Sequence, residues 1–246
     1  MHLGEQGGCR VKLSGRQSHL WLASIDALPL STEEATGILS EAERERAGRF
    51  RFQQDRHVYV GAHYALRSIL SRYLSRMPED IVFLTESDGK PRVEQQEGEK
   101  PLYFNLSHSG VFSLIGVSRV GEIGVDIESI DPSIVIDELA DRVLTSEEMQ
   151  ALAGLDDRDR RDEFYRLWCG KEALLKAEGI GLRRSPATLD LDDAAEGRWP
   201  VLPLRLAAGY AGAVALPRGS DEPVIREWPP TPRSAEPALP RAGPQW

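Results

Sequence analysis

The chain has 246 residues, of which 41% are hydrophobic and 28% are charged, enough apolar material for one large domain or two small ones. That composition excludes collagen-like, coiled-coil and wholly disordered chains. Acidic residues outnumber basic ones by 39 to 30, which gives a formal net charge of −9. Broad binding of nucleic acid needs clustered basic residues, so we expect no nucleic-acid partner.

The cysteine content and the hydropathy pattern indicate a cytoplasmic protein. Cys9 and Cys169 cannot build a disulfide framework, and no CxxC pair offers a zinc site. The N-terminal residues lack the apolar stretch of a secretory signal. No segment approaches the roughly 18 apolar residues of a membrane span, so we expect no membrane partner.

Residues 1–17 are polar and form an expected lead-in to the first half. Ser31 with Glu34 and Ser40 with Glu43 are capping boxes, which satisfy the free N–H groups at a helix start. Apolar residues at helical spacing predict a longer helix over residues 53–75. Strands are expected at residues 19–26, 81–84, 102–107 and 112–117.

The second half follows the same alternation of strands and helices. Thr145 with Glu148 is a third capping box, and a helix over residues 161–178 ends at Gly179, as helices commonly do. Strands are expected at residues 122–128, 188–192, 199–206 and 210–216.

The order of elements predicts an α+β protein in two halves, residues 18–121 and 122–216. Residues 217–246 hold 8 of the 16 prolines. A segment so rich in proline is expected to be a disordered tail without ladders or helices.

Among the chemical signals, the segment GVDIE at residues 124–128 is the strongest. Alternate residues of a strand share a face, so Asp126 and Glu128 point the same way. Two like charges side by side repel, and a bound divalent cation such as Mg²⁺ removes the conflict. A solvent-facing edge is the plain structural alternative, and this motif alone slightly favours it.

A second signal lies in the helix expected at residues 164–179. Lys171 falls in the middle of its apolar stripe, where a lysine usually has a partner. Glu172 and Lys176 lie four residues apart, which an ordinary surface ion pair also explains. A third metal carboxylate and two phosphate-binding cations would account for all three residues.

Three further segments carry groups that suit an anion. NLSHSG at residues 105–110 places hydroxyls, a histidine and backbone N–H groups at one turn, and the chain lacks the GxSxG elbow of a serine hydrolase. DGKP at residues 88–91 is a turn. Five arginines between residues 44 and 56 are interleaved with acids as in an exposed, salt-bridged helix, although one or two could bind a phosphate.

Taken together, NLSHSG, GVDIE and WxxKEAxxK resemble the 4′-phosphopantetheinyl transferases of the surfactin-synthetase type. The stretch ERERAGRF…DR and the DGKP turn extend the resemblance over roughly residues 20–216. It implies a monomer of two similar α/β halves related by a pseudo-two-fold, with coenzyme A and Mg²⁺ bound in the cleft between them.

The resemblance also implies a reaction. A serine hydroxyl of an acyl or peptidyl carrier protein would lose its proton to Glu172 and attack the β-phosphate of coenzyme A. The phosphopantetheine arm would move to the carrier, and adenosine 3′,5′-bisphosphate would leave, stabilised by Lys176. The carrier's pathway (fatty acid, polyketide, nonribosomal peptide or a reductase domain) stays open.

The residues that the resemblance assigns fall into two sets. The metal ligands would be Asp126, Glu128 and Glu172, an all-oxygen set that also suits Mn²⁺. Lys171 and Lys176 would face the pyrophosphate. The coenzyme A contacts would be Arg46, Arg49, Lys90, Pro91, Asn105, Ser107, His108, Lys171 and Lys176.

Two positions depart from the family pattern. Glu43 stands three residues before Arg46, where the family often has a basic residue, so one phosphate contact is expected to be missing. Gly170 replaces a bulkier residue inside the helix, which costs about 1 kcal/mol relative to alanine and is expected to loosen Glu172.

Two other classes of protein are rivals to this assignment. A metal-dependent nuclease also groups Asp, Glu and Lys, but its Glu and Lys normally sit two apart on a strand, and the net charge is unfavourable. A non-catalytic coenzyme A or nucleotide-binding module would bind the ligand without transferring any group.

Overall fold

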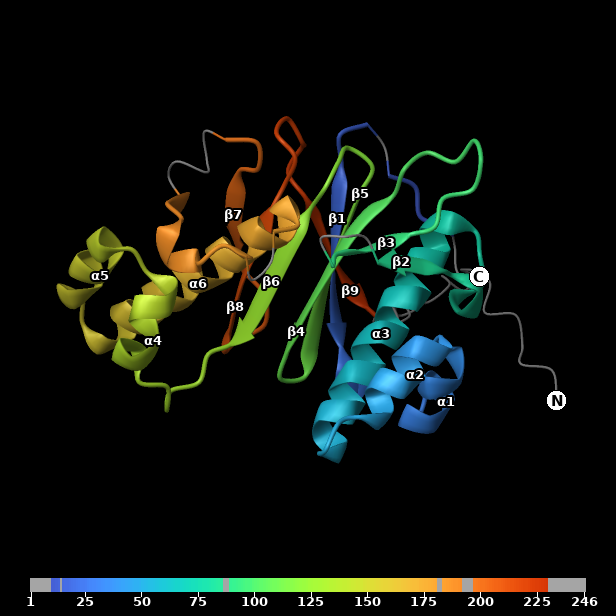
Figure 1. Ribbon diagram of the computed structural model, residues 1–246, viewed down its shortest axis with the longest axis horizontal. Coiled ribbons are helices and arrows are strands. Elements are labelled where there is room, and N and C mark those ends of the chain that lie inside the picture. Colours follow the sequence, from blue (N-terminus) through green and yellow to red (C-terminus); the bar gives the residue numbers. More distant parts are fainter. Residues whose placement is uncertain (1–9, 14, 86–88, 181–182, 192–196, 230–246) are drawn as a thin grey trace, which may run out of the picture.

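The computed structural model describes residues 10–13, 15–85, 89–180, 183–191 and 197–229 (Figure 1). The helices are α1 (Thr32–Ile38), α2 (Glu41–Gly48), α3 (Gln53–Leu74), α4 (Ile136–Val143), α5 (Ser146–Ala153) and α6 (Asp157–Glu178). The strands are β1 (Ser18–Ser24), β2 (Phe83–Thr85), β3 (Pro91–Val93), β4 (Tyr103–Ser109), β5 (Phe112–Ser118), β6 (Gly124–Ser129), β7 (Val201–Leu204), β8 (Tyr210–Ala215) and β9 (Val224–Trp228).

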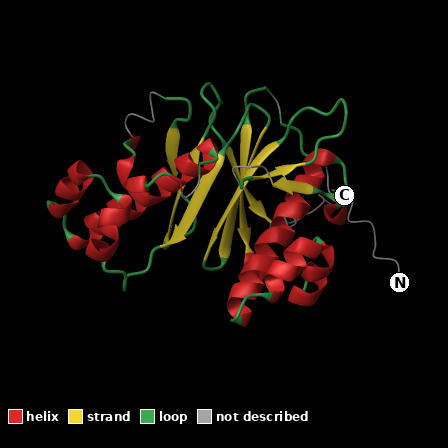
Figure 2. Ribbon diagram, in the orientation of Figure 1, coloured by secondary structure: helices red, strands yellow, loops and turns green. Residues whose placement is uncertain are grey.

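The strands form two main sheets, one in each half. The first sheet has the order β4-β5-β1-β9, and the second has the antiparallel order β6-β8-β7. β2 and β3 make a separate two-stranded ladder. Figure 2 shows the strands gathered in the middle of the molecule with the helices on either side.

The two halves repeat one sequence of elements. Each begins with a strand (β1 or β6), continues with two short helices and a 22-residue helix (α3 or α6), and later adds antiparallel strands. In each half the long helix packs on its own sheet (Figure 1). The prediction of an α+β protein made of two similar halves is confirmed.

The capping boxes set where three of the short helices begin. Ser31, Ser40 and Thr145 each accept a hydrogen bond from the N–H of the glutamate three residues on, and each glutamate accepts in return. This reciprocal pattern satisfies two otherwise free donors at each helix start. All three predicted helix starts are confirmed.

The strands β4 and β6 belong to different sheets, and side chains join them. Asn105 Oδ1 accepts the N–H of Val125 at 2.9 Å, and Ser109 Oγ accepts the N–H of Ser129 at 3.0 Å. Behind this junction Val125 and Ile127 are fully buried in an apolar core that lies between the sheets. The alternation of β6 therefore sends Asp126 and Glu128 to the opposite face, toward α6.

The expected tail contains a strand, which corrects the prediction for residues 217–246. Val224–Trp228 forms β9, pairs in parallel with β1, and buries Trp228 against Tyr64 at a ring separation of 5.5 Å. The segment VIREW has no internal proline, so it can join a ladder although prolines flank it. Residues 1–9 and 230–246 lie outside the described residues.

The strand expected at residues 188–192 is also wrong for the part that the structure describes. Pro186–Thr188 is a 3₁₀ turn, which proline favours at a helix start. Leu189 is buried against Leu174 and Leu175 of α6, and residue 192 lies outside the described residues.

Glycine at position 124 is expected to be indispensable to the packing of α6 on β6. A Cβ there would lie 1.9 Å from the Ala173 carbonyl oxygen and 2.5 Å from the Ala177 nitrogen. Because backbone cannot move aside as a side chain can, Gly124→Ala should lower the free energy of unfolding by about 3 kcal/mol, measured by urea denaturation. Gly37→Ala, where a Cβ meets nothing within 4 Å, is the control and should not destabilise. Equal unfolding free energies for the two variants would contradict this account.

Candidate active site

A cavity of about 390 Å³ opens where β4, β6 and α6 meet. Its lining side chains are Leu106, Ser107, His108, Asp126, Glu128, Trp168, Glu172 and Lys176. Trp168, Glu172 and Lys176 follow one another at four-residue spacing, so they occupy one stripe of α6. The cavity therefore contains three carboxylates, one lysine and one histidine, brought from both halves of the chain.

Lys176 is the cation at the centre of this cavity. Its Nζ lies 2.6 Å from Asp126 Oδ1 and donates to Ser107 Oγ at 2.9 Å, and Ser107 Oγ–H in turn donates to Asp126 Oδ1 at 2.8 Å. Asp126 is 2% exposed, and its second oxygen, Oδ2, is buried without a hydrogen-bond partner in the described part of the chain. An unpaired buried carboxylate oxygen is costly and suits a bound cation.

The other two carboxylates hold their protons more tightly than free glutamates do. Burial, then the charge of Asp126, raises the pKa of Glu128 to about 7, although a hydrogen bond from Ser109 Oγ at 2.9 Å opposes the shift. Burial, and again Asp126, raises the pKa of Glu172. Both shifts reflect the crowding of negative charge that the strand pattern predicted.

The residues fit a divalent metal by their chemistry, because Asp126, Glu128 and Glu172 crowd together and Asp126 Oδ2 lacks a partner. As the side chains lie, however, no three acidic, histidine or cysteine residues in the described segments form a closed ligand set. Lys176 occupies one oxygen of Asp126. Side-chain movement would have to accompany metal binding.

Three neighbouring basic residues, His108, His63 and Arg46, form what we call the basic side of the cavity. Burial, then the positive charges of Lys176 and Arg46, lowers the pKa of His108. Burial also lowers the pKa of His63 to about 4, with smaller contributions from His108 and Arg46. Arg46 is exposed on α2 and stands over the Tyr59 ring at 5.5 Å. These groups are neutral or cationic, and an anion placed among them would favour protonated histidines.

Six of the predicted site residues come together in the cavity: Ser107, His108, Asp126, Glu128, Glu172 and Lys176. Arg46 does not line the cavity, but it lies near enough to His108 for its charge to lower the pKa of that histidine. Asn105 is buried and holds β6 through its side-chain oxygen. Arg49 is exposed, and its Nη2 lies 3.8 Å from Glu45.

Lys171 does not face the cavity, which corrects its predicted role as a pyrophosphate contact. Its side chain is fully buried, its Nζ donates to the Val143 carbonyl at 2.9 Å, and it pairs with Glu148. Burial lowers the pKa of Lys171, while Glu148 opposes the shift. The partner that a lysine in an apolar stripe requires is, for Lys171, the carboxylate of Glu148 in the same half.

Lys90 and Pro91 also lie outside the cavity lining. Lys90 Nζ is 2.6 Å from Glu122 Oε2 and donates to the Ile123 carbonyl at 3.1 Å. Pro91 is the exposed first residue of β3. Residues 86–88 of the predicted turn lie outside the described residues.

The two departures from the family pattern both have packing roles. Glu43 forms a buried ion pair with Arg67, at 2.7 Å. Gly170 lets Leu191 approach α6, since a Cβ there would come within 2.6 Å of the Leu191 side chain. The helix continues unbroken through Gly170 to Glu178, so the expected loosening of Glu172 is absent from the backbone.

Two residues near the carboxylates were not predicted. Ser109 holds Glu128, and Trp168 lines the cavity. The period of two in β4 could have found Ser109, since residues 105, 107 and 109 share one face. The four-residue spacing from Glu172 could have found Trp168.

Comparison with known proteins gives the family. A family model described as the 4'-phosphopantetheinyl transferase superfamily matches residues 122–214, and one described as 4'-phosphopantetheinyl transferase, N-terminal, matches residues 28–119. The boundary between the two matches falls where the chain passes from β5 to β6. The chain belongs to the 4′-phosphopantetheinyl transferase family.

Three relatives support this membership. A putative 4'-phosphopantetheinyl transferase of Synechocystis sp. is 37% identical over 166 residues, 68% of this chain and 66% of the relative. HetI, a 4'-phosphopantetheinyl transferase of Nostoc sp., is 36% identical over 174 residues, 71% and 73% of the two chains. The 4'-phosphopantetheinyl transferase Sfp of Bacillus subtilis is 34% identical over 157 residues, 63% and 67% of the two chains.

Glu128 should give the metal-free protein a specific dependence of stability on pH. Its pKa of about 7 in the folded chain exceeds the ordinary 4.5. The proton that it binds in the folded state therefore stabilises the fold fully below the ordinary pKa, and this contribution is lost as the pH rises through 7. Glu128→Gln keeps the shape without the charge, so its unfolding free energy should exceed that of the wild type by more at about pH 8 than at about pH 5.

The measurement is urea unfolding of both proteins in EDTA at the two pH values. Glu163→Gln is the control, because the pKa of Glu163 is lowered, chiefly by its hydrogen bonds with Arg166. A difference between Glu128→Gln and wild type that does not change with pH would refute the raised pKa.

Proposed function

We propose that this protein transfers the 4′-phosphopantetheine arm of coenzyme A to a serine hydroxyl of an acyl or peptidyl carrier protein. The single observation that carries the proposal is the cavity between the halves, where Asp126, Glu128 and Glu172 lie with Lys176 and His108. A diphosphate needs cations and a metal site together, and the cavity places Lys176 beside three carboxylates whose chemistry suits a divalent metal. The names of the relatives support the same reaction.

In this proposal Glu172 accepts the serine proton. Burial and the charge of Asp126 raise its pKa, so its carboxylate is a stronger base than that of a free glutamate. The serine oxygen forms a bond to the β-phosphorus, and the bond from that phosphorus to the bridging oxygen breaks. Adenosine 3′,5′-bisphosphate leaves with that oxygen, and the proton stays on Glu172 or passes to solvent.

Lys176 would stabilise the leaving phosphate. Asp126 and Ser107 hold its ammonium group in place, so the cation needs little reorganisation when negative charge develops on the phosphate. His108, beside Lys176, would contact the nucleotide end of the coenzyme. Arg46 would add a positive charge there, besides that of Lys176.

Asp126, Glu128 and Glu172 would hold Mg²⁺, or Mn²⁺, which also accepts carboxylate oxygens. When bound, the ion supplies positive charge against the diphosphate, whose negative charge rises during transfer. The chain's own contribution is to hold Asp126 through Ser107 and Glu128 through Ser109, in the cavity that Glu172 also lines.

We propose further that the protein acts as a monomer in the cytoplasm. Among the described residues no helix is both long and apolar enough to cross a membrane. The cavity is built within one chain, so a second copy is not needed to complete it.

Intact-mass spectrometry of an apo carrier protein, incubated with this protein, coenzyme A and Mg²⁺, tests the reaction. We expect the carrier to gain the mass of one phosphopantetheine arm and EDTA to prevent the gain. Coenzyme A binding without any gain on several carriers would instead favour a non-catalytic binding module. Cleavage of nucleic acid with Mg²⁺ would support the nuclease alternative.

Glu172→Gln should abolish turnover, because an amide cannot accept the serine proton. General-base catalysis contributes about 10²- to 10⁴-fold, so the initial rate of carrier modification should fall by at least about 100-fold. Glu163→Gln is the matched control on the same helix, since Glu163 is paired only with the exposed Arg166 in the described structure. Full activity of Glu172→Gln would remove the proposed base.

A further inference from the structure

Each half of the molecule buries one cation at the same place in its long helix. Arg67 is the fifteenth residue of α3, and Lys171 is the fifteenth residue of α6. Both side chains are fully buried, a rare state for either residue type unless it is paired. The repeated position indicates that the two cations do the same structural work in the two halves.

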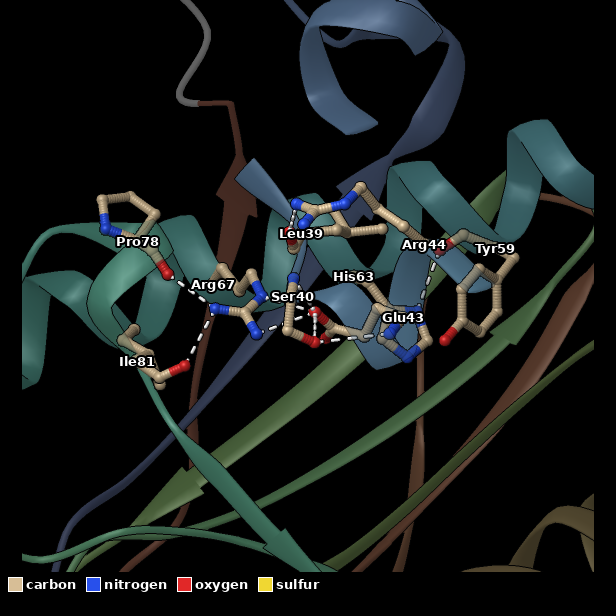
Figure 3. Close-up of polar contacts among 9 residues, drawn as sticks. All are labelled: Leu39, Ser40, Glu43, Arg44, Tyr59, His63, Arg67, Pro78 and Ile81. Atoms are coloured by element: carbon tan, nitrogen blue, oxygen red, sulfur yellow. Dashed lines mark hydrogen bonds and ion pairs between the residues drawn. The ribbon is translucent and has the colours of Figure 1, made fainter. Parts of the chain in front are cut away.

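The partner of each cation is the glutamate of the preceding capping box. Arg67 Nε donates to Glu43 Oε2 at 2.9 Å, with Nη2 2.7 Å from the same oxygen (Figure 3). Lys171 pairs with Glu148 Oε2. Glu43 also accepts the N–H of Ser40 at 2.7 Å, and Glu148 accepts the N–H of Thr145 at 2.8 Å. Each carboxylate thereby ties the start of a short helix to the middle of a long one.

Each cation also donates to backbone carbonyls of a third segment. Arg67 Nη1 donates to the carbonyls of Pro78 and Ile81 at 2.8 and 2.9 Å (Figure 3). Lys171 Nζ donates to the carbonyl of Val143 at 2.9 Å. A buried charge that lost these acceptors would be strongly destabilised, so the helix cannot turn or slide without breaking them. We call these two arrangements the N-terminal pin (Arg67, Glu43) and the C-terminal pin (Lys171, Glu148).

The two pins hold different parts of the proposed machinery. Lys171 directly precedes Glu172 and lies five residues before Lys176, so it sets how α6 presents both residues to the cavity. Glu43 lies on α2 three residues before Arg46, and Arg67 lies one turn beyond His63 on α3. The N-terminal pin therefore sets the basic side of the cavity, and the C-terminal pin sets its reacting side.

We propose that Lys171 and Arg67 are positioning residues with separable effects on the reaction. Lys171 sets Glu172 and Lys176 for the transfer step, and Arg67 sets α2 and Arg46 for binding the coenzyme's phosphates. This inference rests on the proposed function. It gives Glu43 a role that a basic residue could not fill, because a second cation beside buried Arg67 would repel it.

Steady-state kinetics with varied coenzyme A separate the two effects. Lys171→Met keeps the apolar stem and should lower kcat by about 10- to 100-fold, because a small misplacement of reacting groups costs about that much in rate. The KM for coenzyme A should change by less than about 3-fold. Arg67→Met should raise the KM for coenzyme A by about 10-fold, the equivalent of one charge-assisted contact, with a smaller effect on kcat.

Arg76→Met is the matched control, because it removes an arginine from another partly buried ion pair. Arg76 pairs with Glu99 and donates to the Glu94 carbonyl at 2.8 Å, and it lies in the first half away from the cavity lining. It should change kcat and KM by less than about 2-fold. Lys171→Arg keeps the cation and should restore part of the kcat lost in Lys171→Met.

Before the kinetics, the circular dichroism spectrum and the midpoint of urea unfolding of each variant are compared with those of the wild type, to establish that the variant folds. If Lys171→Met does not fold, Glu148→Gln, which keeps a hydrogen-bond acceptor but loses the charge, takes its place with the same expected direction. The same kinetic pattern for both pins, or a kcat for Lys171→Met no lower than for Arg76→Met, would overturn the proposal.

The proposed function can fail separately. A wild-type protein that binds coenzyme A in calorimetry without transfer would overturn the reaction alone, and Arg67→Met should then still weaken binding while Lys171→Met should not. If wild type and all variants bind coenzyme A with equal affinity, the proposed positioning roles of the pins are overturned as well. A wild type that does not bind coenzyme A would also overturn them.

Discussion

The bridge of side chains between β4 and β6 is the interaction on which the rest of the site depends. The two strands belong to different sheets, and yet Asn105, Ser107 and Ser109 each bond to β6 or its carboxylates. Polar side chains at every second residue of β4 make four hydrogen bonds to β6 in place of a backbone ladder. Those contacts hold the halves together and aim Asp126 and Glu128 at α6.

Holding like charges together has an energetic cost that the structure meets locally. Lys176 neutralises one oxygen of Asp126, the raised pKa of Glu128 keeps it partly protonated, and Ser109 donates to it. A cavity arranged this way is electrostatically suited to a cation, because its own residues leave negative charge only partly compensated. The same crowding, together with burial, makes Glu172 a better base, so the basicity of Glu172 and the partly compensated negative charge have one physical origin.

Patterns that depend on near neighbours could be predicted from the sequence, and pairings across the fold could not. Capping boxes and the period of two in β6 gave the helix starts and the shared face of Asp126 and Glu128, because both follow from local geometry. The burial of Lys171 was visible in its apolar stripe, but its partner Glu148 lies 23 residues away. Proline content hid β9, whose partner is the first strand of the chain.

The position of β9 means that the halves are not independent along the chain. The sheet of the first half ends with a strand supplied after the second half, and Trp228 of that strand covers Tyr64 of α3. During synthesis the edge of β1 therefore stays open until the last part of the described chain leaves the ribosome. An open edge attracts other strands, and a truncated first half would present it permanently. Cutting the gene at the boundary between the family matches would thus yield an aggregation-prone fragment.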